Sequence, residues 1–94
     1  MSELTAKRFI VSGTVQGVFF RASTRQQALQ LDIRGYAKNL ANGSVEVFAI
    51  GSSAAIAILE RWLWQGPSTA RVNDVIAVTE FHSGLDSHVG FATL

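Results

Sequence analysis

GTVQGVFFR, residues Gly13 to Arg21, is the most informative stretch of the chain. It follows an apolar run typical of a β-strand and precedes a stretch rich in helix formers, which indicates a strand, a bend and a helix. Its two glycines let the backbone bend so that consecutive N–H groups converge on one point. The helix start adds unpaired N–H groups, and Arg21 adds a forked cation suited to phosphate. The stretch therefore predicts a pocket for one phosphate group.

The same residues exclude three other kinds of phosphate loop. A Walker loop requires Lys and then Ser or Thr after its last glycine, whereas Val18 follows Gly17. The G-x-G-x-x-G spacing of dinucleotide-binding loops is missing after Gly13. A thiol phosphatase needs a nucleophilic Cys, and the chain contains none. The loop is therefore predicted to hold phosphate without attacking it.

Composition is typical of a small globular protein. With 94 residues, 48% of them hydrophobic, the chain is expected to form a single domain, residues 1–94, with one core. Zero Cys excludes a disulfide framework. The sequence has no apolar window near the roughly 18 residues of a membrane span, and its first residues do not resemble a signal peptide. We therefore expect a cytoplasmic protein with no membrane partner.

Charge is distributed unevenly along the chain. The net charge of +1 argues against a general nucleic-acid binder. Six basic and two acidic residues lie at or before Lys38, a net of +4, and two basic and five acidic residues follow it, a net of −3. This asymmetry either steers a small anion toward the loop or reflects a solvated basic face.

The remaining pattern predicts further strands and helices. Strands are expected at residues 7–13, 35–40, 44–50 and 71–81, and helices at residues 22–31 and 54–64. Positions at helical spacing are Ala22, Gln26, Leu29 and Ile33 for the first helix, and Ile56, Leu59 and Leu63 for the second. Asn42-Gly43 marks a turn between two strands, and Gly66-Pro67 ends the second helix. Residues 82–88 are expected to form an exposed loop, and residues 89–94 are a candidate for a short fifth strand.

The order β-α-β-β-α-β packs most simply as an α+β ferredoxin-like sandwich, in which two helices cover one face of an antiparallel sheet. The first and third strands are then central neighbours, and the second strand runs parallel to the first. Asn39 is the polar side chain near the end of the second strand. It is therefore expected near the mouth of the loop, although the fold alone implies no activity.

Two long motifs closely resemble the signatures of the acylphosphatase family. The first is GTVQGVFFR, and the second runs from residues 35–39, GYAKN, through residues 43–45, GSV, to Gly51. Gly66-Pro67 and the residues after it are similar to the family's usual exit from its second helix. The resemblance therefore covers nearly the whole chain.

The resemblance implies hydrolysis of small acyl phosphates to a carboxylate and inorganic phosphate by a cytoplasmic monomer without metal or another cofactor. It assigns Arg21 to the substrate phosphate and Asn39 to the attacking water. Inorganic phosphate would be both product and competitor, and neither nucleic acid nor a membrane is implied as a partner. The loop amides that would share the phosphate belong to Val15, Gln16, Gly17, Val18, Phe19 and Phe20.

The chemistry of the leaving group supports the same substrate class. The candidate site has no identified carboxylate or His, and an Asn amide does not act as a base. A carboxylate, with a conjugate-acid pKa of about 4, can leave unprotonated, whereas an alkoxide, whose conjugate acid is far weaker, needs a proton. A site built from Arg, backbone amides and Asn therefore suits acyl phosphates.

Other interpretations of the sequence remain. His82, Asp86 and His88 form a weak metal-binding pattern that fits an exposed loop better. RNA binding on the sheet is disfavoured because strand 44–50 offers only Phe48 for base stacking. A regulatory domain that binds an anion without turnover is the main alternative to an enzyme. Turnover of an acyl phosphate would distinguish the two.

Overall fold

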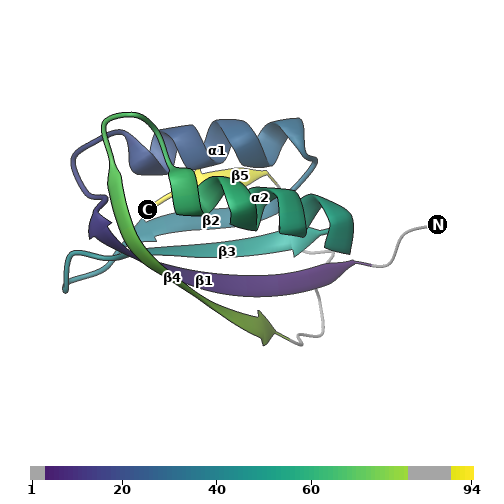
Figure 1. The fold of residues 1–94 in the computed structure, drawn as a ribbon. Coiled ribbons are helices and arrows are strands. Elements are labelled where there is room, and N and C mark those ends of the chain that lie inside the picture. Colours follow the sequence, from purple (N-terminus) through teal and green to yellow (C-terminus); the bar gives the residue numbers. More distant parts are fainter. Residues whose placement is uncertain (1–3, 81–89) are drawn as a thin grey trace.

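Two helices cover one face of a five-stranded sheet in the computed structural model, which describes residues 4–80 and 90–94 (Figure 1). The elements are β1 (Thr5–Thr14), α1 (Phe20–Gln30), β2 (Arg34–Asn39), β3 (Val45–Gly51), α2 (Ser53–Gln65), β4 (Arg71–Glu80) and β5 (Phe91–Thr93). This order confirms the ferredoxin-like sandwich and includes the short fifth strand.

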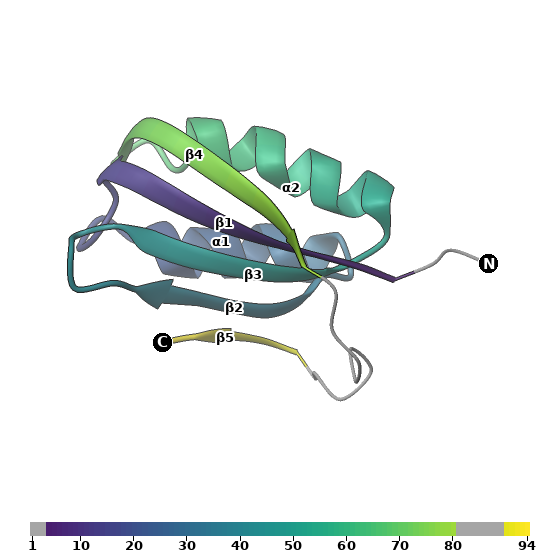
Figure 2. The same cartoon turned by 90° about the horizontal axis from the view of Figure 1, so that it is seen from below.

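The sheet has the strand order β4-β1-β3-β2-β5 (Figure 2). As predicted, β1 and β3 are antiparallel neighbours at its centre. Because β2 is also antiparallel to β3, β1 and β2 run in the same direction and end at the same edge of the sheet. The first loop and the end of β2 are thereby brought to one side of the molecule.

β5 makes the sheet mixed rather than wholly antiparallel, because it pairs in parallel with β2. The reason is topological. β4 is antiparallel to β1, so it ends on the side of the sheet where β1 and β2 begin. A next strand that starts on that side runs in the same direction as β2. β5 consequently ends near the C-terminal end of β2, where Asn39 N donates to the main-chain oxygen of Leu94 over 3.1 Å.

α1 buries a different stripe from the one at the predicted helical spacing. The helix begins at Phe20, two residues before the expected start, and its buried residues are Phe20, Thr24 and Ala28. Thr24 can be buried because its hydroxyl donates to the main-chain oxygen of Phe20 over 2.8 Å within the helix. The phenyl ring of Phe20 packs against Trp62 of α2, with ring centroids 5.9 Å apart. The start of α1 is thus fixed by the core.

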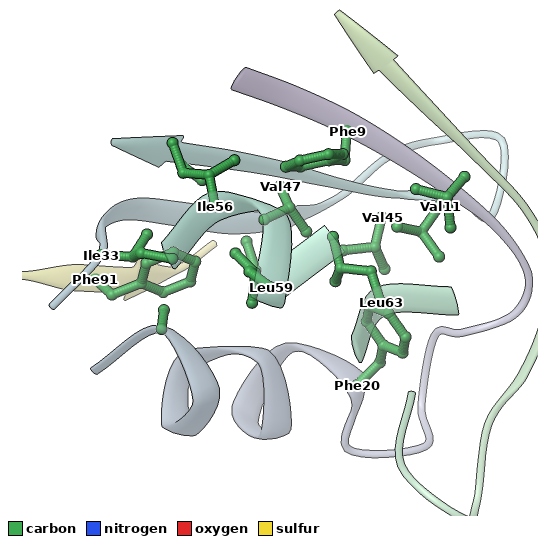
Figure 3. Close-up of a cluster of buried hydrophobic side chains, with 14 of the residues drawn as sticks. Phe9, Val11, Phe20, Ile33, Val45, Val47, Ile56, Leu59, Leu63 and Phe91 are labelled. Atoms are coloured by element: carbon green, nitrogen blue, oxygen red, sulfur yellow. The ribbon is translucent and has the colours of Figure 1, made fainter. Parts of the chain in front are cut away.

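The core lies between the helices and the sheet, and α2 contributes the stripe predicted from its sequence (Figure 3). The helix is capped by Ser52, whose hydroxyl accepts from Ala55 N over 3.1 Å. Fully buried side chains labelled in the figure are Phe9, Val11, Phe20, Ile33, Val45, Val47, Ile56, Leu59 and Leu63. In the part of the chain that the structure describes, no helix has both the length and the apolar character needed to cross a membrane.

Candidate active site

The chain leaves β1 through a close contact that only glycine permits. Gly13 has a φ of 128°, and a Cβ there would lie 2.1 Å from the main-chain oxygen of Arg71 in β4. The pairing of β1 with β4 also shifts register between Ser12 and Gly13. This irregularity directs the chain away from the sheet and into the following loop.

Residues 15–19, the β1–α1 loop, turn through two left-handed backbone conformations. Gly17 has a φ of 73° and Phe19 a φ of 63°. Glycine adopts this region readily, whereas a bulky residue does so rarely. A Cβ at Gly17 would meet no atom within 4 Å, so glycine is favoured there by conformation and not by space. Phe19 serves as the N-cap residue of α1 and provides no side-chain hydrogen bond to it.

The N–H groups of the loop are available for a ligand. From Val15 to Phe20, none of them donates a hydrogen bond to another residue in the described ranges 4–80 and 90–94. The first N–H groups of α1 continue this row, because the first turn of a helix has no intrahelical acceptors. Grouped unpaired N–H dipoles at a helix start favour a bound anion.

Side chains hold the loop without using these N–H groups. The Gln16 side chain donates from Nε2 to the main-chain oxygens of Leu40 and Ser44, over 2.8 and 2.9 Å. The Thr69 hydroxyl, from the connection between α2 and β4, donates to the oxygen of Val18 over 2.6 Å. Sequence reasoning missed both contacts, although a polar amide within an otherwise apolar loop was a usable signal for Gln16. These contacts hold the loop through the main-chain oxygen of Val18 and the side chain of Gln16.

Arg21 and Asn39 share one main-chain oxygen as a partner. Arg21 Nη1 donates to the oxygen of Leu94 over 2.7 Å, and Asn39 N donates to the same oxygen over 3.1 Å. The helix start and the end of β2 are therefore linked through the end of the chain. Nothing in the local sequence signals this contact, because Arg21 and Leu94 are 73 residues apart.

The side chain of Asn39 carries a buried polar atom without a partner. Its Oδ1 accepts no hydrogen bond from any residue in the described part of the chain. An unsatisfied buried acceptor costs about 1–3 kcal/mol, and buried polar groups of this kind are commonly satisfied by an ordered water. The Asn39 side chain therefore retains an acceptor that no residue in the described part of the chain satisfies.

A pocket of about 310 Å³ opens between the loop, the first turn of α1 and β5. Arg21 is the charged side chain in its wall, and the described residues that line it include no carboxylate, His or Cys. Asn39 is not part of this wall. The lining residues are Val15, Gly17, Phe19, Phe20, Arg21, Ala22 and Thr93. The pocket can bind an anion, and its described lining residues offer no carboxylate, imidazole or thiol for acid–base or thiol chemistry.

A metal site has no support from the described residues. None of their Asp, Glu and His side chains form a group of three placed to hold an ion. The weak pattern formed by His82, Asp86 and His88 lies outside the residues that the structure describes.

Known proteins of one family match this chain in sequence and in fold. The acylphosphatase family model matches residues 7–92. The acylphosphatase of Xanthomonas campestris pv. campestris (strain 8004) is 60% identical over 72 residues, which are 77% of this chain and 82% of that protein. The chain belongs to the acylphosphatase family, as its two motifs predicted, and is an enzyme that hydrolyses acyl phosphates.

Solved structures support the same assignment. The structure of an acylphosphatase from Coxiella burnetii superposes with a TM-score of 0.87 at 40% identity, covering 97% of this chain and 93% of that one. The acylphosphatase from Bacillus subtilis gives a TM-score of 0.88 at 29% identity, covering 98% and 99%. The ferredoxin-like arrangement is thus shared with enzymes of this class.

Proposed function

We propose that this enzyme cleaves the carboxyl–phosphate bond of small acyl phosphates by direct attack of water on a phosphate held by Arg21 and the loop amides. Asn39 orients the water. One observation carries the proposal. The N–H groups from Val15 to Phe20 have no acceptors among the described residues, and they lie next to Arg21. A phosphate group is the ligand that satisfies such a row best.

Arg21 is positioned before substrate arrives. Its Nη1 is held by the oxygen of Leu94, and its remaining N–H groups have no hydrogen-bond partner among the described residues. These groups can bind phosphate oxygens in a forked geometry. A donor that is already oriented does not have to reorganise as charge develops on the phosphoryl group, which is the main source of electrostatic catalysis.

Asn39 acts on the water through its unpartnered Oδ1. An O–H of the water donates to this oxygen, which leaves a water lone pair free to attack phosphorus. Asn cannot accept a proton as a base does, so the water proton passes to a phosphate oxygen or to solvent. As the new P–O bond forms, the bond to the acyl oxygen breaks and the carboxylate leaves with the electron pair.

The pocket composition explains the preference for acyl phosphates. The described lining residues include no acid that could protonate a leaving group. A carboxylate leaves without a proton, because its conjugate acid has a pKa of about 4. We expect the chain to act as a single-domain cytoplasmic monomer without metal, with inorganic phosphate as product and competitor.

Benzoyl phosphate hydrolysis by the purified protein, with and without a chelator, tests the proposal. We expect turnover that the chelator leaves unchanged, competitive inhibition by inorganic phosphate and negligible turnover of a simple alkyl phosphate. Comparable rates on the alkyl phosphate, or loss of activity in the chelator, would contradict the mechanism.

A further inference from the structure

A second hollow lies next to the loop pocket, between the exposed side of α1 and β5. Its volume is about 610 Å³. Its lining residues are Phe19, Ala22, Ser23, Arg25, Gln26 and Thr93. Because Phe19, Ala22 and Thr93 also line the loop pocket, the two hollows adjoin. A substrate whose phosphate occupies the first can extend into the second.

Arg25 gives this hollow a positive charge in a fixed position. It lies four residues after Arg21, so the two side chains leave the same face of α1 one turn apart. Arg25 Nε donates to the main-chain oxygen of Phe91 over 2.9 Å, as Arg21 does to that of Leu94. Three residues of extended chain span about 10 Å, so the two oxygens that hold these guanidinium groups lie roughly that far apart.

The other groups around the hollow are suited to an anion on a carbon framework. The terminal Nη groups of Arg25 have no hydrogen-bond partner among the described residues. The described lining contains no carboxylate, and Ser23, Gln26 and Thr93 add neutral donors. Phe19 is 76% exposed and lines both hollows, so its ring offers an apolar surface where they meet. Neither Arg25 nor the exposed ring is used by the mechanism above.

We propose that this hollow is the acyl subsite, and that it favours acyl groups carrying a second negative charge, which Arg25 binds. The inference rests on the proposed placement of the substrate phosphate at the loop and Arg21. The acyl framework then lies along Phe19 and Thr93, with its carboxylate or second phosphate at Arg25. With bonds of about 1.5 Å, a meta-substituted benzoyl phosphate places its second anion about 7 Å from phosphorus. This distance fits between two cations held by oxygens about 10 Å apart.

The test compares 3-carboxybenzoyl phosphate with 3-carbamoylbenzoyl phosphate, its neutral isostere. We expect the wild-type enzyme to have the higher kcat/KM on the charged substrate by about three- to five-fold, the upper part of the range of exposed ion pairs. The preference should decline with added salt. Equal kcat/KM values, or a preference for the neutral substrate, would overturn the subsite. No turnover of either substrate would overturn the proposed function itself.

Substitutions test whether Arg25 causes the preference for the charged substrate. Arg25→Gln should abolish the preference for the charged substrate, and Arg25→Lys should keep part of it. Arg61→Gln, the same change at an exposed position of α2, should keep all of it. A purely supporting role for Arg25 on β5 would lower kcat/KM equally for both substrates and would refute the proposal. The comparison of the two substrates with the wild-type enzyme, and its salt dependence, need no variant. They test the charge preference of the subsite even if Arg25→Gln folds poorly.

Discussion

The β1–α1 loop, residues 15–19, and the hairpin turn between β2 and β3, residues 41–43, lie at the same edge of the sheet. Each contains a glycine with positive φ, at 73° for Gly17 and 92° for Gly43. The turn pairs its own polar groups, because Leu40 N donates to Ser44 O and Gly43 N to Leu40 O. The loop leaves its N–H groups without acceptors among the described residues. The turn satisfies its own polar groups, whereas the loop leaves its N–H groups available to the proposed phosphate.

Hydrogen bonds also connect the loop to the hairpin turn, and they explain why the loop can keep its N–H groups unpaired. Gln16 donates to Leu40 and Ser44, the residues on either side of the turn. The turn therefore serves as an anchor for the loop. Because the anchoring bonds involve a side chain and carbonyl oxygens, they stabilise the loop while its N–H groups stay free for substrate.

Arg21→Ala should break the loop's function most severely. Removal of the cation beside the N–H row should lower kcat/KM by about 10³-fold or more, as loss of a transition-state arginine does in other phosphoryl transfers. Arg21→Lys should also be poor, because Lys lacks the planar fork. Folding should survive, since Arg21 is not in the core. Kinetics on benzoyl phosphate and phosphate titration calorimetry measure the effect, and full activity of Arg21→Lys would exclude the forked contact.

Asn39→Ala, at the end of β2, should lower the rate of hydrolysis without weakening phosphate binding. Loss of one preorganised hydrogen bond should lower kcat by about 10²–10³-fold, or roughly 3–4 kcal/mol. Phosphate affinity should change little, because the loop and Arg21 are intact. Asn42→Ala is the matched control, since the Asn42 side chain accepts from Ser44 N within the turn, over 3.0 Å. Near-native kcat in a folded Asn39→Ala enzyme would remove Asn39 from the mechanism.

The sequence was sufficient for the features that depend on local pattern. The stripe of α2, Ile56, Leu59 and Leu63, is apolar and periodic, and the structure buries it. The strand directions placed Asn39 at the edge where the loop begins, because β1 and β2 had to be parallel in this topology. Family motifs added the enzyme class.

Features that depend on distant contacts could not be predicted. The stripe of α1 includes Thr24, whose burial depends on a hydrogen bond within the helix and not on hydrophobicity. The tethers of the loop join positions 28 and 51 residues apart, from Gln16 to Ser44 and from Thr69 to Val18. No local periodicity encodes such pairs, since they arise only when separate elements pack.

Gly17→Ala and Gly43→Ala form a matched pair that compares the β1–α1 loop with the hairpin turn directly. Neither added Cβ would meet an atom within 4 Å, so each substitution introduces mainly backbone strain. Each should therefore lower the free energy of unfolding by about 1–2 kcal/mol. Only Gly17→Ala should also lower kcat/KM, by about 10- to 100-fold, because a shifted loop misplaces the N–H groups. Urea unfolding and steady-state kinetics of both variants measure the two effects. Equal activity losses would show that strain alone, and not ligand binding, distinguishes the two glycines.

Thr69→Val should have the smallest effect and tests whether the tethers serve the loop. The substitution keeps the shape of the side chain and removes the hydroxyl that donates to Val18 O. The contact is exposed, so stability should change little, but the loop should sample orientations that bind phosphate less well. We expect the inhibition constant for inorganic phosphate to rise by about 2- to 10-fold, the value of one ordinary hydrogen bond. Thr69→Ser, which keeps the hydroxyl, should restore most of the affinity. If Thr69→Val and Thr69→Ser bind phosphate equally well, Gln16 alone is enough to hold the loop.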